Sequence, residues 1–227
     1  MRPSIGPRAL FLSLAAINLA LAGVQVFLVL KGDPTSQVEL VFQRGYTRNS
    51  RRVLPAVAAG LSLLFAVHAI TVGCTQKSFD LFASGQVTSW WVPRALTHGL
   101  LWLGFALLLG VSSMPVLLLV AAVGGMQVLT EAQKSGYAVS ASALLAAGLA
   151  LGVSFSAQGS HTNLQLVVVG LAALFLVYRV VLAGFKGAAG TSPYGNVALF
   201  TGELAADGVA CAVFSATVLA KVYSSSG

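Results

Sequence analysis

The chain has 227 residues, of which 57% are hydrophobic and only 8% are charged, and its mean hydropathy is +0.87. A soluble domain carries about 25% charged residues, so this composition excludes an ordinary water-soluble domain. The net charge of +7 does not indicate nucleic-acid binding, because the basic residues lie in loops and at helix ends and do not cluster on one exposed face. We expect them to contact anionic lipid head groups.

Seven apolar runs fill most of the chain, and each is about long enough to cross a bilayer as a helix. They cover residues 9–30, 53–74, 92–110, 115–129, 137–157, 164–183 and 197–222. The pattern predicts an all-α membrane protein with one domain over residues 1–227, folded as a seven-helix bundle. The two termini are then on opposite sides of the membrane, although nearly equal numbers of Lys and Arg on the two sides leave the orientation undetermined.

The connections between these runs differ in character. Val38, Leu40 and Phe42 alternate with Glu39, Val41 and Gln43, and Arg44-Gly45 follows. This alternation before a glycine predicts a small β-hairpin between the first two helices. The connections at 110–114 and 158–163 are tight, so the helices on either side of each should be antiparallel neighbours. Cys74 and Cys211 lie at different depths, so no disulfide is expected between them.

Small residues inside the fifth run predict close helix packing. Gly148 and Gly152 form a GxxxG pattern surrounded by alanines, and such a surface lets two helices approach closely. Packing within the chain is the simpler interpretation, and contact with a partner subunit or a second copy is the alternative.

Ionisable residues within membrane helices are costly and are therefore candidate functional residues. They gather toward the N-terminal side of the predicted bundle: Arg94, Glu131, Arg179, Glu203 and Asp207. Glu203 and Asp207 are four residues apart and so share one helix face, where they need cations such as Arg94 and Arg179. A structural ion-pair network is the first interpretation, and a proton path or ligand pocket is the alternative.

Other polar residues lie deeper in the predicted spans. Asn18, His68 and His98 are expected to be hydrogen-bonded core residues, with a proton relay as the alternative for the histidines. The histidines are scattered over different spans, so no metal site is expected. The chain contains no phosphate-binding loop, HExxH motif or Gly-x-Ser-x-Gly motif, which predicts that it is not an enzyme.

The order of several motifs resembles the heliorhodopsins, a divergent branch of the microbial rhodopsins. The second run reads GLSLLFAVHAI, Trp91-Val92 opens the third, the fourth reads VAAVGGMQVLTEAQ, the sixth reads LFLVYR, and the seventh opens with Thr201-Gly202-Glu203 and continues with AVFSA. The long connection after the first run, with its strand-like alternation, is also similar. The resemblance implies a rhodopsin-like bundle of seven helices.

The same resemblance implies that the chromophore chemistry is lost. The lysine that binds retinal in this family falls on Phe214, which has no amine, and Lys221 lies seven residues further on. The position of the family's counterion carboxylate falls on Pro93 and Arg94, and an arginine cannot balance a protonated Schiff base. We therefore expect no cofactor, covalent retinal included, and expect bound lipids only.

Three hypotheses of function follow. The first is a non-catalytic, heliorhodopsin-like structural or accessory subunit, packed against other membrane-protein subunits or itself. The second is a photoreceptor or light-gated transporter that holds retinal in another way. The third is a small transporter or lipid-binding protein that uses the emptied central cavity. The mitochondrial inner membrane and the plasma membrane are the two candidate locations.

Overall fold

The computed structural model describes residues 5–31, 38–41, 47–50, 52–75, 77, 80, 88–132, 148 and 193–224. These residues form five helices and two strands. The helices are α1 (Ile5–Lys31), α2 (Val53–Cys74), α4 (Thr88–Leu108), α5 (Met114–Ala132) and α8 (Pro193–Ser224), and the strands are β1 (Val38–Val41) and β2 (Thr47–Ser50).

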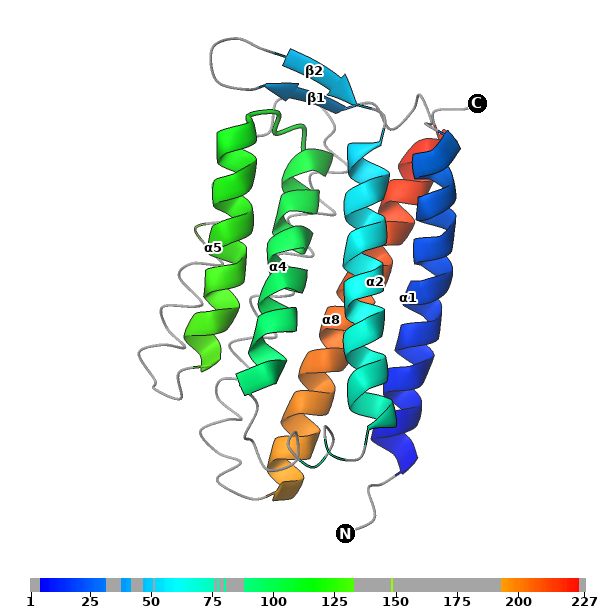
Figure 1. Ribbon diagram of the computed structural model, residues 1–227, viewed down its shortest axis with the longest axis vertical. Coiled ribbons are helices and arrows are strands. Elements are labelled where there is room, and N and C mark those ends of the chain that lie inside the picture. The colour runs from blue at the N-terminus through cyan, green and yellow to red at the C-terminus, as the bar shows by residue number, and fades with distance from the viewer. Residues whose placement is uncertain are drawn as a thin grey trace.

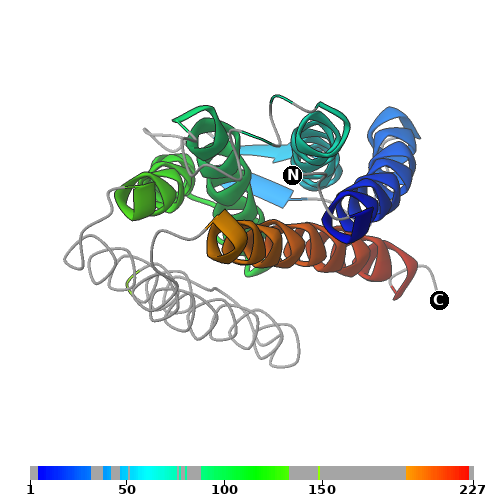
Figure 2. The ribbon, with the colours of Figure 1, turned by 90° about the horizontal axis from the view of Figure 1, so that it is seen from below.

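The first four of these helices stand side by side and alternate in direction (Figure 1). Helix α2 packs against α1, α4 and α8, and α5 packs against α4. Helix α8 is inclined to the others, so that its orange N-terminal end lies beside α4 and its red C-terminal end lies beside α1 (Figure 2). The long α8 therefore connects the α1–α2 pair to the α4–α5 pair.

The predicted seven-helix, rhodopsin-like bundle is wrong. Among the residues that the structure describes, three helices are long and apolar enough to cross a membrane: Gly6–Lys31, Val53–Cys74 and Phe200–Ala220. A fourth apolar helix, Met114–Leu129, is shorter than the roughly 20 residues that a membrane span needs. The structure therefore supports an all-α chain with three candidate spans.

Helix α4, the predicted third span, is not among these candidates because of its composition. Pro93, Arg94, Thr97 and His98 all lie in its first half and lower its hydropathy. The predicted fifth and sixth spans, 137–157 and 164–183, lie outside the described residues except for Gly148. The seven-span prediction thus counted two apolar runs whose helices do not meet the requirements of a membrane span: α4 is too polar, and the apolar part of α5 is too short.

The predicted β-hairpin between the first two helices is confirmed. Strands β1 and β2 pair antiparallel, with Val38 opposite Ser50 and Val41 opposite Thr47. The hairpin caps the end of the bundle where α1 ends and α2 begins (Figure 1). We call this the hairpin end, and the opposite end, where α1 begins, the N-terminal end.

The tight turn predicted between α4 and α5 is also confirmed, and backbone geometry explains it. Gly110 has a φ of 83°, a left-handed conformation that glycine adopts without steric cost. The Val111 amide donates to the Ala106 carbonyl at 2.9 Å and the Gly110 amide donates to the Leu107 carbonyl at 3.1 Å. This pair of hydrogen bonds is the Schellman motif that ends many helices, and it reverses the chain into α5.

Two phenylalanine rings packed on glycines hold α8 in place. A Cβ added to Gly208 of α8 would lie 2.5 Å from the Phe65 ring of α2, and a Cβ added to Gly104 of α4 would lie 2.4 Å from the Phe214 ring of α8. Real Cβ atoms essentially never come this close to another heavy atom. Helix α8 therefore approaches both neighbours at positions that have no side chain.

Candidate functional site

A buried arginine in α4 joins α4 to α8. Arg94 Nε donates to Asp207 Oδ2 at 2.6 Å, and Arg94 Nη1 donates to Glu203 Oε2 at 2.7 Å. Glu203 and Asp207 are four residues apart and so lie one above the other on the same face of α8. The planar guanidinium, which presents several donors in a fixed geometry, bridges the two carboxylates at once.

His98 completes this group, which we call the buried ion cluster: Arg94, His98, Glu203 and Asp207. His98 lies one turn after Arg94 on α4, and its Nε2 is 2.9 Å from Asp207 Oδ1. A carboxylate oxygen only accepts, so Nε2 carries the proton in this hydrogen bond. Both oxygens of Asp207 are thereby hydrogen-bonded to α4.

The cluster is shielded from solvent. The side chains of Arg94, Glu203 and Asp207 are at most 3% exposed, and the Arg94 guanidinium carbon lies 5.7 Å from the centre of the Trp91 ring, within range of a cation–π contact. Charges buried in this way are tolerated only when they are paired and hydrogen-bonded. The local chemistry is therefore that of a firmly held electrostatic link between two helices.

The arrangement does not resemble a metal centre. Among the described residues, no group of three or more His, Cys, Asp or Glu side chains could hold a metal ion. The arginine in the cluster takes the place that a cation would otherwise occupy between the carboxylates. The cluster offers hydrogen-bonded protons and fixed charges, and those are the chemical means available to it.

The structure brings together only some of the predicted site residues. Arg94, His98, Glu203 and Asp207 meet in the buried ion cluster. Arg179 and the side chain of Glu131 lie outside the described residues, so their predicted membership of the network stays a prediction.

The predicted polar residues outside the cluster are also buried. Asn18 of α1 is fully buried and His68 of α2 is 8% exposed. Asn18 Nδ2 donates to the Gly208 carbonyl of α8 at 3.2 Å, so α1 is also linked to α8.

The predicted GxxxG packing surface stays a prediction. Gly148 is exposed, with nothing within 4 Å of an added Cβ, and Gly152 lies outside the described residues.

Phe214, the position where the heliorhodopsin resemblance places the retinal lysine, is fully buried. Its ring stacks edge-on against Phe105 of α4 with 5.6 Å between the ring centres, and it lies directly over Gly104. The Phe214 side chain is therefore packed between the Phe105 ring and the backbone at Gly104.

The sequence analysis missed the contact between two buried serines, which lies beside the Gln25 amide. Ser62 Oγ of α2 and Ser215 Oγ of α8 are 2.8 Å apart, and Gln25 Nε2 of α1 donates to the Ser215 carbonyl at 3.0 Å. A signal was present, because residues 203, 207, 211 and 215 of α8 are Glu, Asp, Cys and Ser at a constant spacing of four, and all four are buried. This spacing places a polar stripe on the inner side of the helix.

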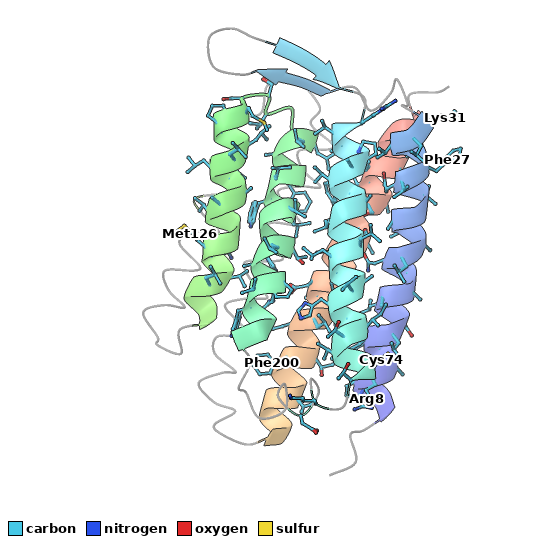
Figure 3. All side chains as sticks on the ribbon, viewed as in Figure 1. Arg8, Phe27, Lys31, Cys74, Met126 and Phe200 are labelled. Carbon is cyan, nitrogen blue, oxygen red and sulfur yellow. The ribbon has the colours of Figure 1, made fainter. Side chains whose placement is uncertain are left out.

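An open apolar groove of about 380 Å³ runs between α4 and α5. Gly99, Ala121 and Gly125 contribute to its lining, together with the larger side chains of Leu96 and Met126. Leu96 and Met126 are more than half exposed, and Met126 projects from α5 on the side away from α4 (Figure 3). The groove therefore opens at an exposed face of the α4–α5 pair.

No protein-family model matches the chain, and no curated protein matches it either.

Proposed function

We propose that this chain is a non-catalytic integral membrane protein that acts as a structural or accessory subunit and carries no covalently bound retinal. The observation that carries the proposal is the content of its interior. Arg94 and His98 of α4 are paired with Glu203 and Asp207 of α8. The Phe105 ring packs edge-on against the buried Phe214 ring. Such an interior serves to hold helices together.

The three candidate spans support the membrane location. Their outward faces carry large apolar side chains that are exposed in the isolated chain, including Ile17, Phe27 and Val67. Surfaces of this kind suit contact with lipid or with other membrane helices. Figure 3 shows Phe27 projecting from the hairpin end of α1, away from the other helices.

The resemblance to the heliorhodopsins stays a prediction, and the proposed function does not depend on it. The lysines of the sequence are Lys31, Lys77, Lys134, Lys186 and Lys221, and none lies in the middle of a described helix. A Schiff base needs a lysine amine beside the chromophore. The absence of one at Phe214 supports a role without light absorption.

The test is the size and colour of the protein extracted from its native membrane. In a mild detergent we expect it to migrate with other membrane proteins, well above its own mass of 23.3 kDa, and to separate from them in sodium dodecyl sulfate. A lone monomer in the mild detergent would contradict the accessory role. Retinal added to the purified protein should give no visible band that hydroxylamine removes, and the appearance of such a band would contradict the absence of a chromophore.

A further inference from the structure

Two buried amide side chains of α1 bind α8 in the same way, one above the other. Asn18 Nδ2 donates to the Gly208 carbonyl at 3.2 Å, and Gln25 Nε2 donates to the Ser215 carbonyl at 3.0 Å. Seven residues separate the two donors and seven separate the two acceptors. The helices α1 and α8 run in the same direction (Figure 1), so the two contacts lie two turns apart along one seam between them.

Each of these amides leaves its oxygen without a partner. Among the described residues, no group donates to Asn18 Oδ1 or to Gln25 Oε1, and both side chains are fully buried. A buried carbonyl oxygen without a donor is unfavourable, and most buried polar atoms in proteins are bonded to protein or to ordered water. Each of these two oxygens therefore calls for a donor inside the seam.

The seam offers polar partners and small neighbours. Ala22 lies between Asn18 and Gln25 on α1, Cys211 lies between Gly208 and Ser215 on α8, and both are buried. Near the contact between Gln25 and Ser215, the hydroxyl oxygens of Ser62 and Ser215 are 2.8 Å apart. Buried water typically occupies sites with two to four polar partners and few bulky groups.

We propose that ordered water molecules occupy the seam between α1 and α8 and donate hydrogen bonds to Asn18 Oδ1 and Gln25 Oε1. Gly208, which accepts from Asn18, directly follows Asp207 of the buried ion cluster. The two proposed water sites, at Gly208 and at Ser215, lie about 10 Å apart along α8 at a rise of 1.5 Å per residue. This internal water goes beyond a purely structural role, because it brings solvent to polar groups buried between two candidate membrane spans.

The test is solid-state NMR of the full-length, ¹⁵N-labelled protein in liposomes, with magnetisation transferred from water to the protein. We expect transfer to the side-chain amides of Asn18 and Gln25 to build up several times faster than transfer to Gln127. Gln127 is a matched control, since it is an equally buried amide whose Oε1 accepts from Trp102 Nε1 at 3.3 Å. Build-up at Asn18 and Gln25 as slow as at Gln127 overturns the proposal, and so does fast build-up at Asn18 alone.

A variant locates the water. Gln25→Met keeps the length of the side chain and removes its amide, so transfer to the backbone amide of Ser215 should slow several-fold while transfer to Asn18 persists. Unchanged transfer to Ser215 in this variant overturns the placement of water at Gln25. The wild-type comparison with Gln127 remains decisive if the variant does not fold.

Discussion

At the scale of single residues, Arg94 carries the most consequence. Its guanidinium forms ion pairs with both carboxylates of the buried ion cluster, at 2.7 Å from Glu203 and 2.6 Å from Asp207. A buried ion pair adds little when it is compared with a well-packed apolar substitute, but removing one partner leaves an uncompensated charge. The cluster therefore responds more strongly to the loss of the arginine than the number of its hydrogen bonds suggests.

Arg94→Met should lower the free energy of unfolding by about 3–5 kcal/mol, because it leaves buried carboxylates without their guanidinium. Arg94→Lys should recover only part of this loss, since a single ammonium cannot bridge the two carboxylates as the planar fork does. The measurement is the unfolding of each purified variant by sodium dodecyl sulfate in mixed micelles.

Lys77→Gln is the matched control for this series, because it also removes a positive charge but at an exposed position near the N-terminal end. Its unfolding free energy should stay within about 0.5 kcal/mol of the wild type. An Arg94→Met variant as stable as Lys77→Gln would show that the ion cluster does not hold α4 to α8.

The sequence predicted the cluster residues better than their polar neighbours, for a physical reason. Arg94, Glu203 and Asp207 are recognisable because a charge inside an apolar helix is costly wherever it lies. Ser62 and Ser215 are ordinary helix residues, and their contact joins positions 153 residues apart. Such a pair becomes visible only when α2 and α8 are placed side by side.

At the scale of helices, α4 and α5 pack through a reciprocal set of small residues. Ala95 and Gly99 of α4 are four residues apart, as are Ala121 and Gly125 of α5. A Cβ added to Gly99 would lie 2.8 Å from the Ala121 carbonyl oxygen, and one added to Gly125 would lie 3.2 Å from the Ala95 carbonyl oxygen. Each helix thus places a glycine against the backbone of the other, as in close helix crossings in membranes.

This crossing involves helices other than the one that the sequence analysis selected. The GxxxG pattern at Gly148 and Gly152 was the most conspicuous in the sequence, whereas the close approach in the described structure uses two patterns of one alanine and one glycine. Small residues are frequent throughout this chain, with 24 glycines. Their spacing alone cannot indicate which of them face another helix.

Gly99→Ala should destabilise the protein by about 1–3 kcal/mol, because the new methyl group meets a backbone atom that cannot rotate away and overpacks the crossing. Gly60→Ala in α2 is the matched control, since nothing lies within 4 Å of its added Cβ. That variant should be neutral or gain up to about 1 kcal/mol from the higher helix propensity of alanine. Thermal unfolding in detergent compares the two, and equal stabilities would contradict the close crossing.

At the scale of the whole molecule, three of the five apolar runs that fall on described helices are candidate membrane spans. Helix α2 has the bounds that its apolar run predicts, Val53–Cys74, since no charged residue interrupts it. Helix α4 departs from prediction because its first half serves the buried ion cluster and is polar for that reason. Mean hydropathy is an average over all side chains of a helix. A helix that contributes buried charged residues to a contact with its neighbours therefore has a lower mean hydropathy than an equally buried apolar helix.

The arrangement of α1 and α2 makes a topological prediction. Lys31 ends α1 at the hairpin end and Cys74 ends α2 at the N-terminal end (Figure 3). The 22 residues of α2 extend about 33 Å at a rise of 1.5 Å per residue, which matches a hydrocarbon core about 30 Å thick. If the pair spans the membrane, these two ends face opposite compartments.

A membrane-impermeant maleimide applied to sealed vesicles should therefore label Cys74, which is exposed, from one side only, and should not label the buried Cys211 until the protein is denatured. In a Cys74→Ser background, Lys31→Cys should be labelled from the opposite side, because Lys31 is exposed at the other end of the pair. Labelling of both positions from the same side would mean that α1 and α2 lie along the membrane surface. Opposite labelling would establish these two helices as a transmembrane pair, to which the amides of α1 and the packing of α2 attach the third candidate span in α8.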